Sequence, residues 1–274
     1  MTAKPLNGGP GEASTRKATI SKAPIGKAPI GKAPICKAMV LAAGLGERMR
    51  PITDTMPKPL VPVQGRAMLD TILDRLEAAG IEEVVINTHY LGQMIQDHLA
   101  ARGEPRIVFS PEDDLLETGG GIKNALPLLG ENAFFALNGD VCWLDGQTAA
   151  LRRLAAAWDP EKMDALLLLH PTALLLAYEG IGDYVMAPDG RLRRRREREI
   201  APFIFAGIQI LHPRLFAGAP EGPFSLNKLY DKAQEAERLW GIRHDGEWYH
   251  VGTPESLREV EDALHHFGPS SAQT

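Results

Sequence analysis

Cysteine and long apolar runs are both scarce in this chain. Only two of its 274 residues are cysteines, Cys36 and Cys142, which is too few for a disulfide framework. No apolar run reaches the roughly 18 to 20 residues that a membrane-spanning helix needs. These two shortages argue against a disulfide-rich secreted domain and a membrane protein. We therefore expect a protein of the reducing cytoplasm without a membrane partner.

A large excess of positive charge is missing as well. The chain has 30 Lys and Arg against 35 Asp and Glu, a formal net charge of −5, which disfavours nucleic acid as the main partner. The exception is the run RLRRRRER over residues 191–198. It fits either an RNA contact or the solvated edge of a β-hairpin. We favour the edge, because charged side chains commonly protect edge strands from pairing with other chains.

A five-residue repeat fills much of the N-terminal segment. From Lys17 the chain reads KATIS, KAPIG, KAPIG, KAPIC, and the prolines oppose both helix and sheet. We therefore predict a disordered extension over residues 1–36, a folded domain over residues 37–265 and a short tail over residues 266–274. The folded length is enough for a large core.

Strand and helix patterns alternate through the first half of this domain, residues 37–145. Apolar runs predict strands over residues 38–43, 83–87, 106–110 and 133–140, and amphipathic patterns predict helices over residues 67–79 and 91–100 and from residue 118. This alternation predicts an α/β fold with a doubly wound, mostly parallel sheet. Ligands of such sheets bind beyond the carboxyl ends of the strands, where Gly44, Ser110 and Asp140 lie.

The second half, residues 146–265, is less regular and predicts a smaller, β-rich part. We expect strands over residues 165–172 and 201–211, a hairpin around the Pro-Asp-Gly turn at residues 188–190, and helices over residues 227–239 and 254–265.

A glycine-rich loop follows the first predicted strand. Gly44 and Gly46 allow backbone N–H groups to approach a phosphate closely, and Arg48 can grip phosphate oxygens bidentately. The loop is no P-loop, because no Gly-Lys-Ser/Thr closes it, and Met49 stands where a dinucleotide fingerprint has its third glycine. A tight turn with a surface arginine would also fit this segment.

Two further segments carry charged groups that suit a nucleotide. Lys58 lies between Pro57 and Pro59, which restrict the backbone on both sides and so direct the lysine. Asp140 ends the fourth predicted strand in an Asn-Gly-Asp sequence, where a carboxylate can hold Mg²⁺ together with phosphates. In isolation each segment also fits an ordinary surface loop.

The three segments together resemble the signature of the sugar-1-phosphate nucleotidyltransferases. VLAAGLGERMRPITDTMPKPLVPV, LETGGGI and NGDV match it in order and spacing, and the resemblance covers about residues 37–263. Among the subfamilies, the pattern looks closest to the bacterial N-acetylmuramate α-1-phosphate uridylyltransferases, with the mannose-1-phosphate guanylyltransferases as the alternative.

The resemblance implies a Rossmann-like nucleotidyltransferase fold, with a nucleotide-binding half over residues 37–145 and a sugar-binding half over residues 146–265. It also implies a reaction in which a sugar 1-phosphate attacks the α-phosphorus of a nucleoside triphosphate and pyrophosphate leaves. The partners would be these two substrates, and the chain would be a monomer or a small homo-oligomer.

The resemblance also implies a set of site residues. Arg48 would stabilise the leaving pyrophosphate, Lys58 would bind the α-phosphate or the sugar phosphate, and Asp140 would ligate Mg²⁺. The implied nucleotide-binding residues are Ala42, Ala43, Gly44, Gly46, Glu112, Thr118, Gly119 and Asn138, with Glu112 at the base edge. The implied sugar-binding residues are Asp183, Gly207, Asn227 and Lys228. Asp183 fits a turn residue equally well, and Asn227 fits a helix N-cap. Two residues of the arginine run at 191–198 would also suit an anionic sugar ligand.

His250 departs from the family pattern. The family commonly has an aspartate before Val-Gly-Thr as a second metal ligand, whereas this chain reads WYHVGT over residues 248–253. Histidine is a poor ligand for Mg²⁺. We favour an arrangement in which Asp140 holds Mg²⁺ together with phosphates and water. The alternatives are that the metal is Mn²⁺, or that metal binding and activity are weak. The departure also leaves open a non-catalytic, nucleotide-sugar-binding regulatory protein.

Overall fold

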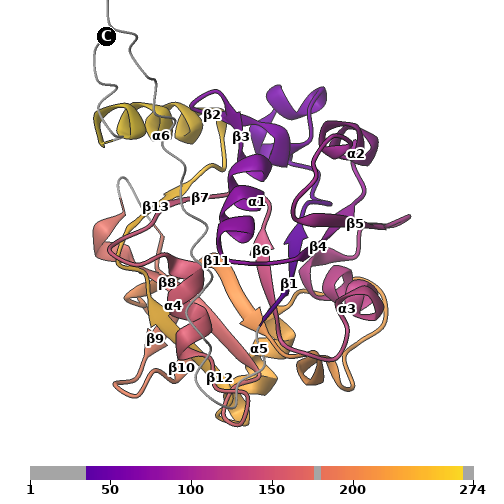
Figure 1. Cartoon of the computed structure of the whole chain (residues 1–274). Coiled ribbons are helices and arrows are strands. Elements are labelled where there is room, and N and C mark those ends of the chain that lie inside the picture. Colours follow the sequence, from indigo (N-terminus) through magenta and orange to yellow (C-terminus); the bar gives the residue numbers. More distant parts are fainter. Residues whose placement is uncertain (1–34, 176–179, 268–274) are drawn as a thin grey trace, which may run out of the picture.

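The computed structural model describes residues 35–175 and 180–267 of the chain (Figure 1). The predicted N-terminal extension, apart from residues 35–36, and the end of the predicted tail lie outside these residues. A nine-stranded sheet forms the centre of the described part, in the order β10-β9-β11-β6-β1-β4-β5, with β8 paired to β11 and β12 to β8. Its strands are β1 (Lys37–Leu41), β4 (Glu83–Thr88), β5 (Arg106–Pro111), β6 (Phe134–Asn138), β8 (Ala165–Pro171), β9 (Tyr184–Met186), β10 (Leu192–Arg194), β11 (Phe203–Leu211) and β12 (Leu239–Arg243).

The first half of the sheet is parallel, as the alternation predicted. β1 lies between β4 and β6 and runs parallel to both, and β5 runs parallel to β4. Successive residues of β1 face opposite layers, because Val40 packs in one buried cluster and Met39 in the other. This burial on both faces explains the uninterrupted apolar runs of the central strands.

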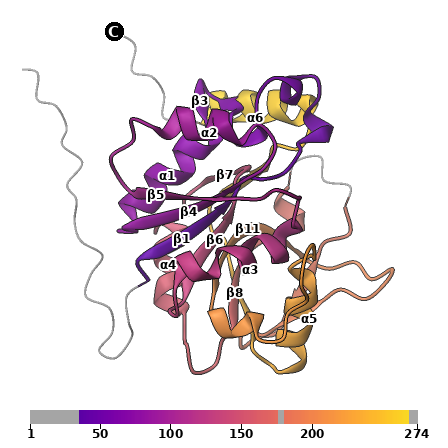
Figure 2. The same ribbon diagram turned by 90° about the vertical axis from the view of Figure 1, so that its right-hand side faces the viewer.

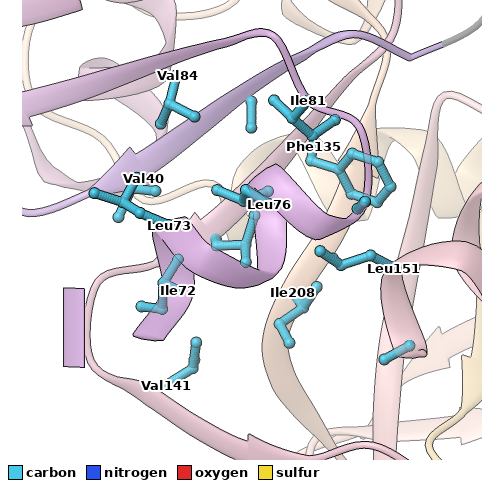
Figure 3. Packing of buried hydrophobic residues seen from close by; sticks show 14 of the residues in the cluster. Val40, Ile72, Leu73, Leu76, Ile81, Val84, Phe135, Val141, Leu151 and Ile208 are labelled. Atoms are coloured by element: carbon cyan, nitrogen blue, oxygen red, sulfur yellow. The ribbon is translucent and has the colours of Figure 1, made fainter. Parts of the chain in front are cut away.

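Helices cover both faces of this sheet, which confirms the doubly wound fold. Figure 2 shows α1 (Met68–Ala78) and α2 (Gly92–Leu99) on one side of β1 and β4, and α3 (Glu117–Leu129) on the other. Ile72, Leu73 and Leu76 of α1 are fully buried against strand residues such as Val40 and Phe135 (Figure 3). Each such side chain contributes about 1.5 to 3 kcal/mol of transfer free energy. In α2, Ile95 and Leu99 are buried, whereas Met94 is exposed.

The second half extends the sheet with antiparallel strands. β11 pairs antiparallel with β6 and β8, and β9 and β10 form the predicted hairpin. The helix α4 (Ala150–Ala157) packs on the same face as α1. The helix α5 (Asn227–Glu235) is shorter than predicted. The chain turns at Glu237, which has a φ of 56°, and Leu239 then starts β12, which pairs with β8.

A smaller layer surrounds one end of the sheet. It contains β2 (Pro62–Val63), β3 (Arg66–Ala67), β7 (Val141–Leu144), β13 (Glu247–His250) and α6 (Pro254–Phe267). Figure 1 shows α6 beside β2 and β3. Met49, Val61, Val251 and Val260 form a buried cluster there, which fixes the loop after β1 to the C-terminal helix. No helix of the described residues is long and apolar enough to cross a membrane.

Candidate active site

A cavity of about 720 Å³ opens where β1 and β6 end, at the carboxyl edge of the sheet. Residues that are far apart in the sequence meet there. Ten of the sequence-predicted residues line it, namely Ala42, Ala43, Gly44, Gly46, Arg48, Lys58, Glu112, Thr118, Asn138 and Asp140. The position agrees with the rule that ligands of doubly wound sheets bind beyond the strand ends.

The loop after β1 forms one wall of this cavity. Gly46 has a φ of 66°, and its carbonyl accepts a hydrogen bond from the Thr53 hydroxyl at 2.8 Å. A single 3₁₀ turn, η1 (Glu47–Met49), follows, in which Met49 is fully buried while Arg48 is exposed. A Cβ at Gly44 would meet nothing within 4 Å. The backbone at Gly44 is therefore open to a ligand, and the buried methionine fixes the turn that carries Arg48.

Lys58 and Asp140 form an ion pair in the cavity, with 2.5 Å between Nζ and Oδ2. Lys58 starts the 3₁₀ turn η3 (Lys58–Leu60), and Pro59 is buried beneath it. Gly139 fits tightly between the ends of β1 and β6, because its N–H donates to the Leu41 carbonyl and an added Cβ would lie 2.6 Å from that oxygen. The proline pair and the Asn-Gly-Asp sequence thus place a cation and a carboxylate against each other.

Asn87, which the sequence reasoning missed, supports this cavity from the end of β4. Its Oδ1 accepts from the Ala42 N–H at 2.9 Å, and its Nδ2 donates to Glu112 Oε1 at 2.7 Å. The other oxygen of Glu112 accepts from the Leu116 N–H at 3.0 Å. Asn87 and Glu112 are only 3% and 7% exposed, so both are fixed in place. The available signal was an amide directly after the apolar run VVI of the strand EVVIN.

The predicted base-pocket residues differ in how they face the cavity. Thr118 lines it, and its hydroxyl accepts from the Leu226 N–H at 3.0 Å. Gly119 does not line it. Its N–H donates to the Phe224 carbonyl at 2.9 Å, and an added Cβ would collide with the Phe224 ring. Gly119 therefore holds the segment around Phe224 against α3.

The predicted sugar-binding residues fall into three different environments. Asp183 and Asn227 line a second cavity of about 590 Å³. Gly207 lies behind the first cavity, at the irregularity of β11, where an added Cβ would collide with Val141 and lie 3.0 Å from Asn138 Nδ2. Lys228 is exposed and lines neither cavity. The N-cap alternative for Asn227 is wrong, because Leu226 occupies the N-cap position and Asn227 begins the helix.

His250 ends β13 and is not among the residues that line the first cavity. Its ring stacks on Trp248, with 6.0 Å between the centroids, and rests against Gly252, which lines the cavity. Desolvation and the positive charges of Lys58 and Arg48 lower the pKa of His250, while Asp140 opposes this shift. The imidazole is therefore disfavoured as a cation in this setting.

The described residues contain no group of three or more His, Cys, Asp or Glu side chains placed to hold a metal ion. Asp140 faces the cavity with a side chain that is 34% exposed. One protein carboxylate combined with phosphate oxygens is a usual arrangement for Mg²⁺. These residues therefore fit a divalent cation that arrives with a nucleotide.

The arginine run forms an ion-paired edge of the sheet. Arg191 pairs with Asp189 and Glu237, and Arg193 pairs with Glu199 through two hydrogen bonds. The strand β10 is at the end of the sheet order. This arrangement agrees with the interpretation of the run as a charged hairpin edge.

The comparisons with known proteins agree with this geometry. A family model described as "Nucleotidyl transferase" matches residues 37–178. The N-acetylmuramate alpha-1-phosphate uridylyltransferase of Caulobacter vibrioides is 46% identical over 82% of this chain and 96% of its own length, and that of Neisseria meningitidis serogroup B is 39% identical over 81% and 96%. A solved UDP-glucose pyrophosphorylase complexed with UDP-glucose has the same fold, with a TM-score of 0.72 at 17% identity over 85% of this chain and 99% of its own. The chain belongs to the nucleotidyl transferase family.

Proposed function

We propose that this chain transfers uridine monophosphate from UTP to N-acetylmuramate α-1-phosphate and releases pyrophosphate. The observation that carries this proposal is the Lys58–Asp140 ion pair, which lines the same cavity as the glycine-rich loop. The chain is also 46% identical to an N-acetylmuramate alpha-1-phosphate uridylyltransferase. The alternative of a mannose-1-phosphate guanylyltransferase has less support, because two relatives of that kind are 30% and 37% identical and this chain spans only 66% and 61% of their lengths. Residues 37–145 would bind the nucleotide and residues 146–265 the sugar.

The proposed reaction needs no nucleophilic side chain, because the phosphate of the sugar substrate is itself the nucleophile. Catalysis then consists of positioning and charge neutralisation. Backbone groups from Ala42 to Gly46 hold the triphosphate. Arg48 binds the leaving pyrophosphate, and Lys58 exchanges its contact with Asp140 for an oxygen of the α-phosphate. This exchange leaves the Asp140 carboxylate available to a cation.

A divalent cation is the cofactor expected for this family, and we propose Mg²⁺. Asp140 would hold it, and the cation would neutralise charge on the phosphates. His250 would remain outside the metal coordination, because hard cations prefer oxygen ligands. The variant His250→Asp tests this assignment. It should stay active with Mg²⁺, whereas complete loss of activity would show that the imidazole is needed.

A matrix of four nucleoside triphosphates against three sugar 1-phosphates tests the function directly. The sugars are the 1-phosphates of N-acetylmuramate, N-acetylglucosamine and mannose, and pyrophosphate release is measured with Mg²⁺ and with Mn²⁺. We expect the highest kcat/KM for UTP with N-acetylmuramate α-1-phosphate. Preference for GTP and mannose 1-phosphate would identify a guanylyltransferase. Pyrophosphate release from no pair would refute the proposal.

A nucleotide-sugar-binding protein without turnover is the second candidate, and His250 in place of the family aspartate is the observation that favours it. Calorimetry distinguishes the two. Tight binding of a nucleotide sugar by a protein that releases no pyrophosphate would support the binding protein.

A further inference from the structure

The second cavity contains two arginines, Arg194 and Arg195, beside Asp183 and Glu197. It is next to the nucleotide cavity along the chain, because Ser225 lines the first cavity and Asn227 lines the second. The strand β11 connects them as well. Its Phe205 lines the second cavity, and two residues further on the backbone reaches Asn138 of the first cavity. These two links place the second cavity beside the cavity that contains Lys58.

The positive charge of Arg194 is balanced by an acidic neighbour, Asp231. Its Nη1 donates to both carboxylate oxygens of Asp231 at 2.6 Å, and its backbone N–H donates to Gln234 Oε1 at 2.6 Å. These contacts fasten the hairpin to α5. A ligand would have to compete with Asp231 for this guanidinium, so Arg194 is a structural residue of the cavity wall.

Among the residues that the structure describes, Arg195 has no such partner. Its backbone N–H donates to the Asp183 carbonyl at 2.8 Å, which fixes its position on the hairpin. Its guanidinium makes one long hydrogen bond, 3.3 Å to the Arg196 carbonyl. Within the described residues no carboxylate lies within 4.0 Å of it, and Arg195 is a half-buried residue that lines the cavity. A guanidinium presents five N–H donors in a fork that matches a carboxylate, so most of its donors remain available to an anion.

The other residues of the cavity wall suit a sugar rather than an inorganic ion. Phe205 offers an apolar surface, and it is held edge-on to Tyr230 with 6.2 Å between the ring centroids. Asp183 is fixed through its Oδ2, which accepts from the Phe205 N–H at 2.9 Å, and its other oxygen can accept from a hydroxyl. Glu197 is exposed and supplies a second acceptor.

We infer that Arg195 binds a carboxylate on the sugar and thereby selects an acidic amino sugar as the acceptor substrate. This inference rests on the proposed function. N-acetylmuramate differs from N-acetylglucosamine by a lactyl ether, which adds one carboxylate and one methyl group. The carboxylate would be bound by the free guanidinium of Arg195, and the methyl group would pack on Phe205. The arginine run then has two roles, because its other members protect the sheet edge.

The test compares two acceptors that differ only in the lactyl group. The kcat/KM for UTP-dependent pyrophosphate release is measured with N-acetylmuramate α-1-phosphate and with N-acetylglucosamine α-1-phosphate, for the wild type and for Arg195→Met. We expect the variant to lose roughly 10- to 100-fold with the lactyl sugar, mainly in KM. With the sugar that lacks the carboxylate, the kcat/KM of the variant should differ from that of the wild type by less than about threefold. Arg195→Lys keeps the positive charge but lacks the forked guanidinium. With the lactyl sugar, its kcat/KM should lie between those of the wild type and Arg195→Met.

Arg196→Met is the matched control, because Arg196 is the next residue, is exposed and lines neither cavity. This variant should have the same kcat/KM as the wild type with both acceptors. Equal losses for both acceptors in Arg195→Met, or no loss for the lactyl sugar, would overturn the inference.

Failure of the proposed function gives a different result, since the wild type would then release no pyrophosphate with either sugar. In that case calorimetric binding of the two sugar 1-phosphates tests Arg195 separately. Weaker binding of only the lactyl sugar by Arg195→Met would support the assignment, and equal binding by the variant and the wild type would overturn it.

Discussion

Replacing Asn87 by leucine should destabilise the protein strongly, although Asn87 belongs to no recognised motif. The two side chains have similar sizes, so the change removes mainly polar contacts. It deletes the bonds to the Ala42 N–H and to Glu112 Oε1. Each buried group left without a partner costs about 1 to 3 kcal/mol. Because two groups lose their partner, we expect the free energy of unfolding to fall by about 3 kcal/mol, which lowers Tm by about 6 to 12 °C for a domain of this size.

Urea denaturation and a thermal melt measure this effect, and Asn124→Leu is the matched control. Asn124 is exposed on α3, and its amide makes only a 3.3 Å hydrogen bond to the Ser110 hydroxyl. The control should change the free energy of unfolding by less than about 0.5 kcal/mol. The KM for the nucleotide should also rise in Asn87→Leu, because Ala42 begins the loop that we propose holds the triphosphate. If Asn87→Leu lowers the free energy of unfolding no more than Asn124→Leu does, the two buried hydrogen bonds of Asn87 do not stabilise the fold as expected.

Two further substitutions and one reactivity measurement have expected outcomes. Lys58→Met should lower kcat at least about 100-fold, as the loss of a group that stabilises developing charge does, with little change in Tm, and a kcat within threefold of the wild type would argue against its role. Gly207→Ala should destabilise by about 2 kcal/mol or more in urea denaturation, because the residue has a φ of 74° and an added Cβ would collide with Val141; an unchanged midpoint would show that β11 can shift. Burial raises the pKa of Cys142 to about 11, so its thiol is almost entirely protonated at pH 8. Iodoacetamide should alkylate it roughly 200-fold more slowly in the native protein than in urea, and the native rate should rise about tenfold per pH unit below that pKa. Equal native and unfolded rates would contradict this.

The sequence predicted the first half of the fold well because its strands are buried on both faces. Such strands have uninterrupted apolar runs, and the strand predicted over residues 38–43 corresponds to β1 at Lys37–Leu41. The strand ends earlier because Ala42 donates its N–H to Asn87 and begins the loop. The end of α5 was missed because the helical pattern continues past Glu237, where the backbone adopts a positive φ.

The motifs predicted which residues meet in the first cavity, because loops at adjacent strand ends share one edge of the sheet. Lys58 and Asp140 are an example, although 82 positions separate them. Asn87 was missed, and Arg195 was not singled out within its run, for a physical reason. The importance of Asn87 depends on two partners from other elements, and that of Arg195 depends on the absence of an acidic neighbour among the described residues. Neither condition leaves a local pattern in the sequence.

The most direct test of the account is the rate of pyrophosphate release by Asp140→Asn with UTP and N-acetylmuramate α-1-phosphate. The amide has the same shape as the carboxylate and removes only its charge, so the fold and the Tm should be preserved. If this carboxylate holds the cation beside the phosphates, kcat should fall by about 100- to 1,000-fold at saturating Mg²⁺. A kcat within tenfold of the wild type, in a variant with unchanged Tm, would contradict the assignment of this cavity as the site of nucleotidyl transfer.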